Sequence, residues 1–274
     1  MGNASQSLLI GALASTLVAG SAMAADLTPP PVIDFEPEYE HKFGGNLYLR
    51  GHVGIGHLTL DDTYNVLYDT ALVVDNLASE FDGVVFGGLG VGYRFNKWFR
   101  TDIYGELRKS TYYGLDRYTD AGGTIGVFDG TNEYDANLTT YLAMANAYVD
   151  LGTYAHITPY VGGGIGVALH EISGYSDTNV PNLGVAYADD NEEYQFAWAL
   201  YAGLGYKVND KLTMDLGYRY LNLGDAESGD VISYIGTNNI VNPQEFRDIV
   251  SHDFMFGMRW ELGGFGHQDT FSGY

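Results

Sequence analysis

The chain has 274 residues with 35 acidic and 13 basic side chains, for a net charge of −22. This balance argues against nucleic acid as a partner and favours an acidic exposed face. Cysteine is absent, so disulfides cannot hold the fold together. Mean hydropathy is only −0.10, and no stretch after residue 24 is apolar over the roughly 18 positions that a membrane-spanning helix needs, which excludes a helical membrane protein.

Residues 1–24 have the pattern of a signal peptide. A short apolar run from Leu8 to Gly20 precedes small residues that end at Ala24. We therefore expect export through the Sec pathway, with cleavage between Ala24 and Ala25. The alternative is a buried first helix, and the segment is unusual because it carries no Lys or Arg.

Residues 25–43 combine four prolines with a run of acidic side chains. Proline-rich, charged sequence favours an extended segment over a strand, so we expect a periplasmic N-terminal tail. Residues 263–274, which follow the last predicted strand, are expected to form a C-terminal tail.

Between these tails, apolar and polar side chains alternate with period two, which indicates strands. In residues 98–108, Ile103 and Leu107 face one way, whereas Asp102, Glu106 and Arg108 face the other. Eight such segments occur, at residues 46–56, 81–95, 98–108, 138–151, 157–169, 194–207, 212–223 and 249–262.

The connections between the predicted strands alternate in length. Short turns fall at residues 96–97, 152–156 and 209–211, and long connections at 58–80, 109–137, 170–193 and 224–248. Short periplasmic turns and long external loops are typical of outer-membrane barrels. The sequence therefore predicts an all-β fold, an eight-stranded antiparallel transmembrane β-barrel over residues 44–262, with four long extracellular loops and three periplasmic turns.

A water-soluble barrel is the competing fold, and it would need the apolar face inside. That face carries Phe196, Trp198, Phe254 and Phe256, among others. Eight strands enclose too little space for such bulk, so these side chains are expected to face lipid. The expected aromatics of the membrane interface are Trp98, Phe99, Trp198, Tyr206 and Trp260.

With the apolar face outward, charged side chains gather in the lumen. They are Arg50, Arg94, Arg100, Asp102, Glu106, Arg108, Asp150, Lys207, Asp215, Arg219, Asp253, Arg259 and Glu261. An unpaired charge in a narrow interior costs several kcal/mol, so these groups are expected to pair. Two interpretations stay open: a charge network that fills the barrel, or a narrow charged pore, since lumen glycines such as Gly90 and Gly164 leave space beside the long side chains.

Patterns typical of enzymes have a simpler explanation here. Glycines at 88, 90 and 92 recur every second residue within a strand, unlike a dinucleotide-binding turn. Ser251, His252 and Asp253 are adjacent in a strand, so they cannot all converge on one side. The seven histidines lack metal-site spacing, and the acidic loops lack a calcium-binding pattern. We expect no enzymatic activity, cofactor or metal.

Six stretches resemble strands of the alphaproteobacterial outer-membrane β-barrel family, also called opacity-type or porin-like, a relative of the OmpA barrel. They are LYLRGHVG at 47–54, WFRTDIYG at 98–105, ANAYVDLG at 145–152, ITPYVG at 157–162, DLGYRYLN at 215–222 and SHDFMFGMRW at 251–260. The resemblance is absent from the long connections. The family's last strand usually ends in an aromatic residue, whereas this chain continues past Leu262.

The resemblance implies a surface protein of the Gram-negative outer membrane that supports envelope integrity. The alternatives are a narrow small-solute porin and a surface receptor or adhesin, for example one that binds haem. Expected partners are outer-membrane lipid, lipopolysaccharide and the barrel-insertion machinery, with no nucleic acid, and the expected state is a monomer or weak oligomer.

Overall fold

The computed structural model describes residues 46–66, 69, 71–234 and 240–263. The predicted signal peptide and N-terminal tail lie outside the described residues, as does the C-terminal tail beyond residue 263. No helix of the described residues is long and apolar enough to span a membrane. The strands are β1 (Asn46–Thr59), β2 (Asp62–Tyr64), β3 (Ala71–Phe81), β4 (Val84–Arg94), β5 (Phe99–Asp120), β6 (Gly130–Asp150), β7 (Ile157–Asn179), β8 (Gly184–Ala188), β9 (Asn191–Lys207), β10 (Leu212–Ser233) and β11 (Pro243–Gly263).

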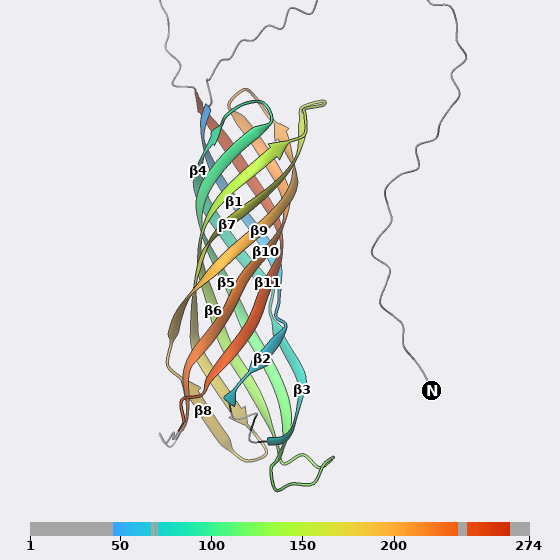
Figure 1. Cartoon of the computed structure of the whole chain (residues 1–274), viewed down its shortest axis with the longest axis vertical. Coiled ribbons are helices and arrows are strands. Elements are labelled where there is room, and N and C mark those ends of the chain that lie inside the picture. The colour runs from blue at the N-terminus through green and yellow to red at the C-terminus, as the bar shows by residue number, and fades with distance from the viewer. Residues whose placement is uncertain (1–45, 67–68, 70, 235–239, 264–274) are drawn as a thin grey trace, which may run out of the picture. The chain divides into compact units, whose positions relative to one another are not determined.

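The strand pairing closes eight of these strands into a barrel, whose wall is seen from the side in Figure 1. Antiparallel pairing runs β1–β4–β5–β6–β7–β9–β10–β11, and β11 pairs with β1 to complete the ring. Closure satisfies the backbone hydrogen bonds of every strand, which is the condition for crossing lipid with β-structure. The predicted eight-stranded antiparallel barrel is confirmed.

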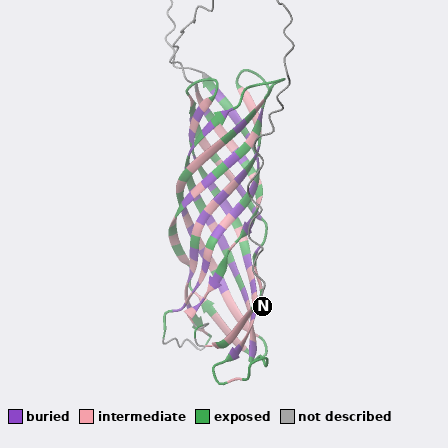
Figure 2. Cartoon of the chain, turned by 45° about the vertical axis from the view of Figure 1, so that its right-hand side comes forward, coloured by how far each residue is buried: buried purple, intermediate pink, exposed green. Residues whose placement is uncertain are grey.

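Along most of the barrel strands, buried and exposed residues alternate, which gives the chequered ribbon of Figure 2. In β5, Ile103 is 60% exposed, whereas Asp102 is 4% and Arg108 is 2% exposed. The apolar side chains therefore form the outer surface and the charged ones fill the interior. This arrangement is the reverse of a water-soluble barrel and fits a surrounding of hydrocarbon.

The long connections differ from the expectation of loops. Residues 109–137 were expected to be a loop, but β5 continues to Asp120 and β6 begins at Gly130, so only residues 121–129 join them. β7 likewise runs to Asn179, β10 to Ser233, and β11 starts at Pro243. Outside the hydrocarbon both faces of a strand can be polar, so the alternation that reveals a strand disappears there.

Three further strands lie within the same connections and widen this part of the sheet. β3 pairs with β5, β2 pairs with β11, and β8 pairs with both β7 and β10. Phe81, expected at the start of the strand over 81–95, instead ends β3, and β4 starts at Val84. We call the part of the barrel beyond Lys109 of β5, built by these strands, the extracellular extension, because the sequence analysis expects the long connections on the outer side of the membrane.

Candidate functional site: the charged lumen

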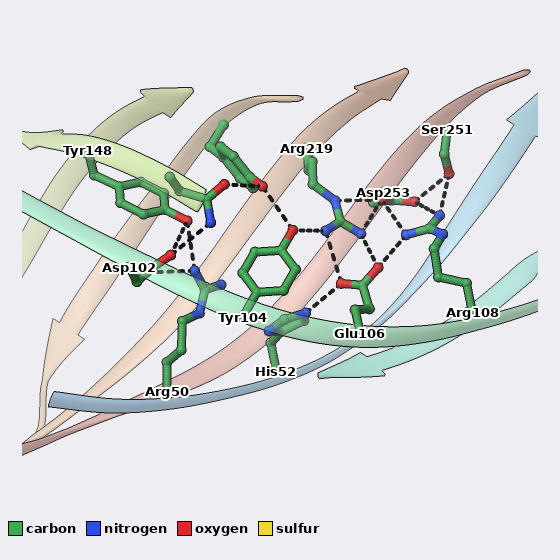
Figure 3. A network of polar contacts seen from close by, with 12 residues as sticks. Arg50, His52, Asp102, Tyr104, Glu106, Arg108, Tyr148, Arg219, Ser251 and Asp253 are labelled. Atoms are coloured by element: carbon green, nitrogen blue, oxygen red, sulfur yellow. Dashed lines mark hydrogen bonds and ion pairs between the residues drawn. The ribbon is translucent and has the colours of Figure 1, made fainter. Parts of the chain in front are cut away.

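The centre of the lumen holds two arginines between two carboxylates (Figure 3). Arg219 of β10 lies 2.7 Å from both Glu106 of β5 and Asp253 of β11. Arg108 lies 2.7 Å from Glu106 and 2.9 Å from Asp253, and also donates a 2.7 Å hydrogen bond to Ser251. We call these residues the central cluster. Its two positive and two negative charges balance, which removes the cost of an isolated buried charge.

Two side chains connect the central cluster to the barrel wall. His52 Nε2 lies 2.6 Å from Glu106 Oε2. Arg219 Nη1 donates a 2.6 Å hydrogen bond to the Tyr104 hydroxyl, which lies 2.9 Å from the hydroxyl of Tyr201. Side chains from four separate strands, β1, β5, β9 and β10, are thereby joined by polar contacts.

A second group surrounds Asp102. Its carboxylate accepts hydrogen bonds from Arg50 at 2.8 Å, Asn146 at 2.8 Å and Tyr48 at 3.1 Å. Arg50 also donates a 2.7 Å hydrogen bond to the Tyr148 hydroxyl. Asp102 is thus held by the charge of Arg50 and by neutral donors, and these partners come from two other strands, β1 and β6.

Toward the periplasmic turns the remaining arginines pair one by one. Arg100 lies 3.2 Å from Asp150, and Arg259 lies 2.7 Å from Asp215. Arg94 pairs with Glu261 at 2.5 Å. Each of the six lumen arginines, named here and above, therefore has a carboxylate partner.

Twelve of the thirteen charged residues expected in the lumen lie there, and Lys207 does not. Lys207 is exposed and lies 3.0 Å from Asp210 on a periplasmic turn. It is the last residue of β9, so the inward–outward alternation stops constraining its long side chain at that point.

The sequence analysis gave the lumen tyrosines no role in the site. Tyr148 and Tyr160 flank Arg100, whose guanidinium carbon lies 4.0 and 4.8 Å from their ring centroids. The lumen glycines were read as leaving space, but a Cβ atom on Gly92 would overlap the ring of Tyr48, and one on Gly162 would overlap Tyr148. The tyrosine rings fill the space that the glycines leave. In the sequence, glycines and tyrosines that share the inward face of neighbouring strands were the pattern that could have predicted this packing.

Above the central cluster, apolar side chains close the lumen toward the outside. The rings of Phe81, Tyr112 and Phe246 contact one another, with centroids 4.7–5.9 Å apart. Buried aliphatic residues surround them: Leu58, Leu138, Ile172, Leu221, Leu223 and Ile249. We call this layer the apolar plug.

Beyond the plug, the mouth of the extension contains a cavity of about 280 Å³ lined by Asp116 and Asp177. Tyr134 donates a 2.6 Å hydrogen bond to Asp116. Burial, with the neighbouring Asp116 carboxylate adding to it, raises the pKa of Asp177 to about 7. Within the described residues, no three His, Cys, Asp or Glu side chains are placed to hold a metal ion.

The expected interface aromatics divide into two groups. Trp98, Tyr206 and Trp260 are more than half exposed at the periplasmic ends of their strands, where amphipathic rings favour the membrane boundary. Phe99 is half-buried against Trp98, with ring centroids 5.9 Å apart. Trp198 is also half-buried, against Tyr220 at 5.3 Å, and stands well inside β9 instead of at its periplasmic end.

The Ser251–Asp253 stretch is arranged as its strand geometry predicts. Ser251 and Asp253 face the lumen, where the serine hydroxyl donates a 2.6 Å hydrogen bond to the carboxylate. His252 points outward and lies 2.6 Å from the Tyr218 hydroxyl. The three side chains therefore do not form a catalytic triad.

Comparison with known sequences finds a match to one family. The pattern of the outer membrane protein beta-barrel domain matches residues 10–247. A protein of Brucella abortus is 29% identical over 266 residues, covering 88% of this chain and 93% of its own. Outer membrane protein PagN of Salmonella typhimurium is 29% identical, covering 78% and 89%, and a putative adhesin of Rickettsia canadensis is 27% identical, covering 64% and 73%.

Among solved structures, the outer membrane protein OprG of Pseudomonas aeruginosa superimposes with a TM-score of 0.50 at 14% identity. The match covers 81% of this chain and 98% of OprG. Similarity at this identity concerns the fold, and it agrees with the closed barrel described above.

Proposed function

Because the chain belongs to the outer membrane protein beta-barrel domain family and lies in the Gram-negative outer membrane, we propose that it is a closed, non-enzymatic surface barrel. In this proposal the filled lumen holds the extracellular extension rigidly and supports the integrity of the envelope. The paired lumen charges are the observation that carries it.

Conduction would need a continuous water-filled path, and three features oppose one. The cavity between Arg50 and Arg259 measures only about 20 Å³, enough for about one water molecule. The apolar plug lies between the central cluster and the mouth. Each lumen arginine is paired, so moving one aside to let an ion pass would leave a buried charge without its partner.

Planar-bilayer recording of the refolded protein tests the closed lumen. We expect no stepwise conductance from the wild-type protein. The matched variant Tyr112→Ala/Phe246→Ala/Arg219→Ala removes bulk from the plug and the central cluster, and should produce steps if it refolds. Stepwise conductance from the wild type would instead favour the narrow porin.

A role in envelope integrity has its own test. Deletion of the gene should make cells more sensitive to bile salts or dodecyl sulfate, and complementation with the wild type should restore resistance. Complementation with a variant whose lumen network is broken, Arg219→Leu, should restore it only in part. Unchanged sensitivity of the deletion strain would contradict this part of the proposal.

Adhesion is the second candidate function, and the extracellular extension favours it. Strands β5, β6, β7, β10 and β11 continue beyond the membrane as a paired sheet, and relatives include a putative adhesin. Beads coated with the refolded protein should bind host cells, and replacing residues 121–129 by a short Gly-Ser linker should reduce binding. Equal binding by coated and bare beads would exclude adhesion.

A further inference from the structure

The outer wall of the barrel has a groove on one side. The outward-facing residues that line it belong to β1, β4, β5, β6, β7 and β9, and its volume is about 700 Å³. Its floor consists of Gly87, Gly105 and Ala143, which the strand register places side by side with Leu107 and Leu89. A Cβ atom built on Gly105 meets no other atom within 4 Å, so the space in front of it is open.

Among the described residues, the remaining wall shows no such floor of small residues. Past the edge of the groove, the outward face of β9 and β11 carries Phe196, Leu200, Phe254 and Phe256, each 46–63% exposed. The concave surface is therefore a local feature of β4–β7 and does not extend around the whole barrel. An apolar groove of this size in a hydrocarbon surrounding fits an acyl chain.

The upper rim of the groove is polar. Lys109 follows Leu107 by two residues on the same outward face of β5 and is exposed. Tyr141 and Tyr194, which line the groove, are 49% and 71% exposed. Such side chains lay their apolar part along the wall and extend the polar end to the membrane boundary.

Lys109 is placed at the level of lipid headgroups. From Phe99 to Lys109 the strand advances ten residues, which at the usual rise and tilt corresponds to about 25 Å, the height of the apolar band. Lys109 therefore lies at the outer boundary of the hydrocarbon, where the phosphates of the outer leaflet are found.

Lys109 is also available to receive an anion. In the described part of the chain it forms no ion pair, whereas Arg117 and Arg247 of the extension pair with Asp75 and Glu245. The nearest outward carboxylate across β6 is Glu171, opposite Thr139. It lies two strand spacings away, about 10 Å. On the other side of β5, the exposed Asp82 is the nearer acidic neighbour, since its backbone N–H donates to the carbonyl of Thr111, and the described residues show no ion pair between Asp82 and Lys109.

We propose that this groove binds lipopolysaccharide, with one acyl chain on the floor of Gly87, Gly105 and Ala143 and a headgroup phosphate at Lys109. A lysine ammonium is a compact charge suited to phosphate, and the acidic surface elsewhere repels it. The site does not depend on the lumen, so the conductance experiment leaves it untouched.

The test measures lipid A binding to the refolded protein in detergent by native mass spectrometry. Gly105→Leu fills the groove and Lys109→Gln removes the charge, and we expect each to weaken binding by about tenfold or more. The matched controls Ala202→Leu on the opposite wall and Lys97→Gln on a periplasmic turn should bind like the wild type. Lipid A without its phosphates should bind the wild type as weakly as lipid A binds Lys109→Gln.

Each other outcome overturns the assignment. Unchanged affinity for lipid A in Gly105→Leu would contradict binding of an acyl chain in the groove. Unchanged affinity in Lys109→Gln would contradict binding of a phosphate at Lys109. Equal binding of phosphorylated and dephosphorylated lipid A removes the role of the lysine. If the wild type is a dimer and Gly105→Leu makes it a monomer, the groove holds a second copy of the chain instead of lipid. Folding of each variant is checked by its heat-modifiable mobility on a gel.

Discussion

At the scale of single residues, the charged side chains of the lumen stabilise the fold only when they are paired. Arg219 is wholly buried and contacts both carboxylates of the central cluster. Removing one partner of a buried ion pair leaves the other charge uncompensated, which costs more than the pair itself contributes.

We therefore expect Arg219→Leu to lower the free energy of unfolding by about 3–5 kcal/mol. Urea unfolding in lipid vesicles, followed by tryptophan fluorescence, measures it. Arg100→Ala and Asp102→Ala should also lower the unfolding midpoint, whereas Lys97→Gln on a turn should leave it unchanged. A midpoint for Arg219→Leu equal to that of Lys97→Gln would mean that the network contributes little to stability.

Asp177 at the mouth gives a pH-dependent prediction. Its pKa is raised from 3.8 to about 7 by burial and by Asp116. Above about pH 7 the ionised carboxylate of Asp177 therefore lowers the free energy of unfolding by its full amount. As the pH falls toward 4 the carboxylate of the folded state is protonated and this destabilisation is lost.

Asp177→Asn should consequently raise the melting temperature at pH 8 by at least about 4 °C and leave it unchanged at pH 4. The exposed Asp135→Asn is the control and should show no such difference. Circular dichroism in detergent at pH 4, 6 and 8 measures both variants. A gain for Asp177→Asn that is the same at all three pH values would contradict the shifted ionisation.

At the scale of strands, glycine and tyrosine on the inward face act together. Gly92 of β4 lies beside Tyr48 of β1, where a Cβ atom would overlap the ring. Adding bulk to a filled interior forces neighbouring side chains or the backbone to move, at a cost of about 1–3 kcal/mol.

Gly92→Val should therefore reduce refolding yield and lower the urea midpoint, and Tyr48→Ala in the same chain should restore part of the loss. Gly105→Leu, on the outward face, should refold like the wild type because its Cβ meets open space. Failure of both glycine variants alike would show that strand flexibility, and not ring packing, is what these positions require.

The same scale shows how far the sequence could predict the structure. Within the membrane, residues that face lipid must be apolar, whereas those that face the lumen are charged or polar. The polarity of the sequence therefore alternates, and β5 was predicted over 98–108. Beyond Lys109 water wets the outer face, Thr111, Tyr113 and Asp116 no longer alternate by polarity, and the strand was taken for a loop. The partners of the lumen ion pairs could not be predicted from the sequence either. Arg108 and Asp253, for example, are 145 residues apart, and only closure of the barrel brings them together.

At the scale of the whole molecule, paired strands and flexible loops predict different behaviour toward proteases. Arg117 and Arg247 both lie within paired strands of the extension. Backbone in a hydrogen-bonded ladder must open before a protease can bind it.

Trypsin added to intact cells should therefore leave the chain uncut at Arg117 and Arg247. A single Thr124→Lys substitution, in the connection between β5 and β6, should introduce a cleavage site. Immunoblotting of the fragments measures the result. Rapid cutting of the wild type at Arg117 would mean that this region moves like a loop.

The length of β5 has a consequence for any encounter at the cell surface. From Lys109 to Asp120 the strand adds about 25 Å beyond the hydrocarbon boundary. The tips of the hairpins are thus held by rigid paired strands instead of flexible loops. They are already ordered before a ligand binds. Binding of a ligand there costs little conformational entropy of the protein, because the hairpin tips are already ordered. Even a modest contact area can therefore give measurable affinity.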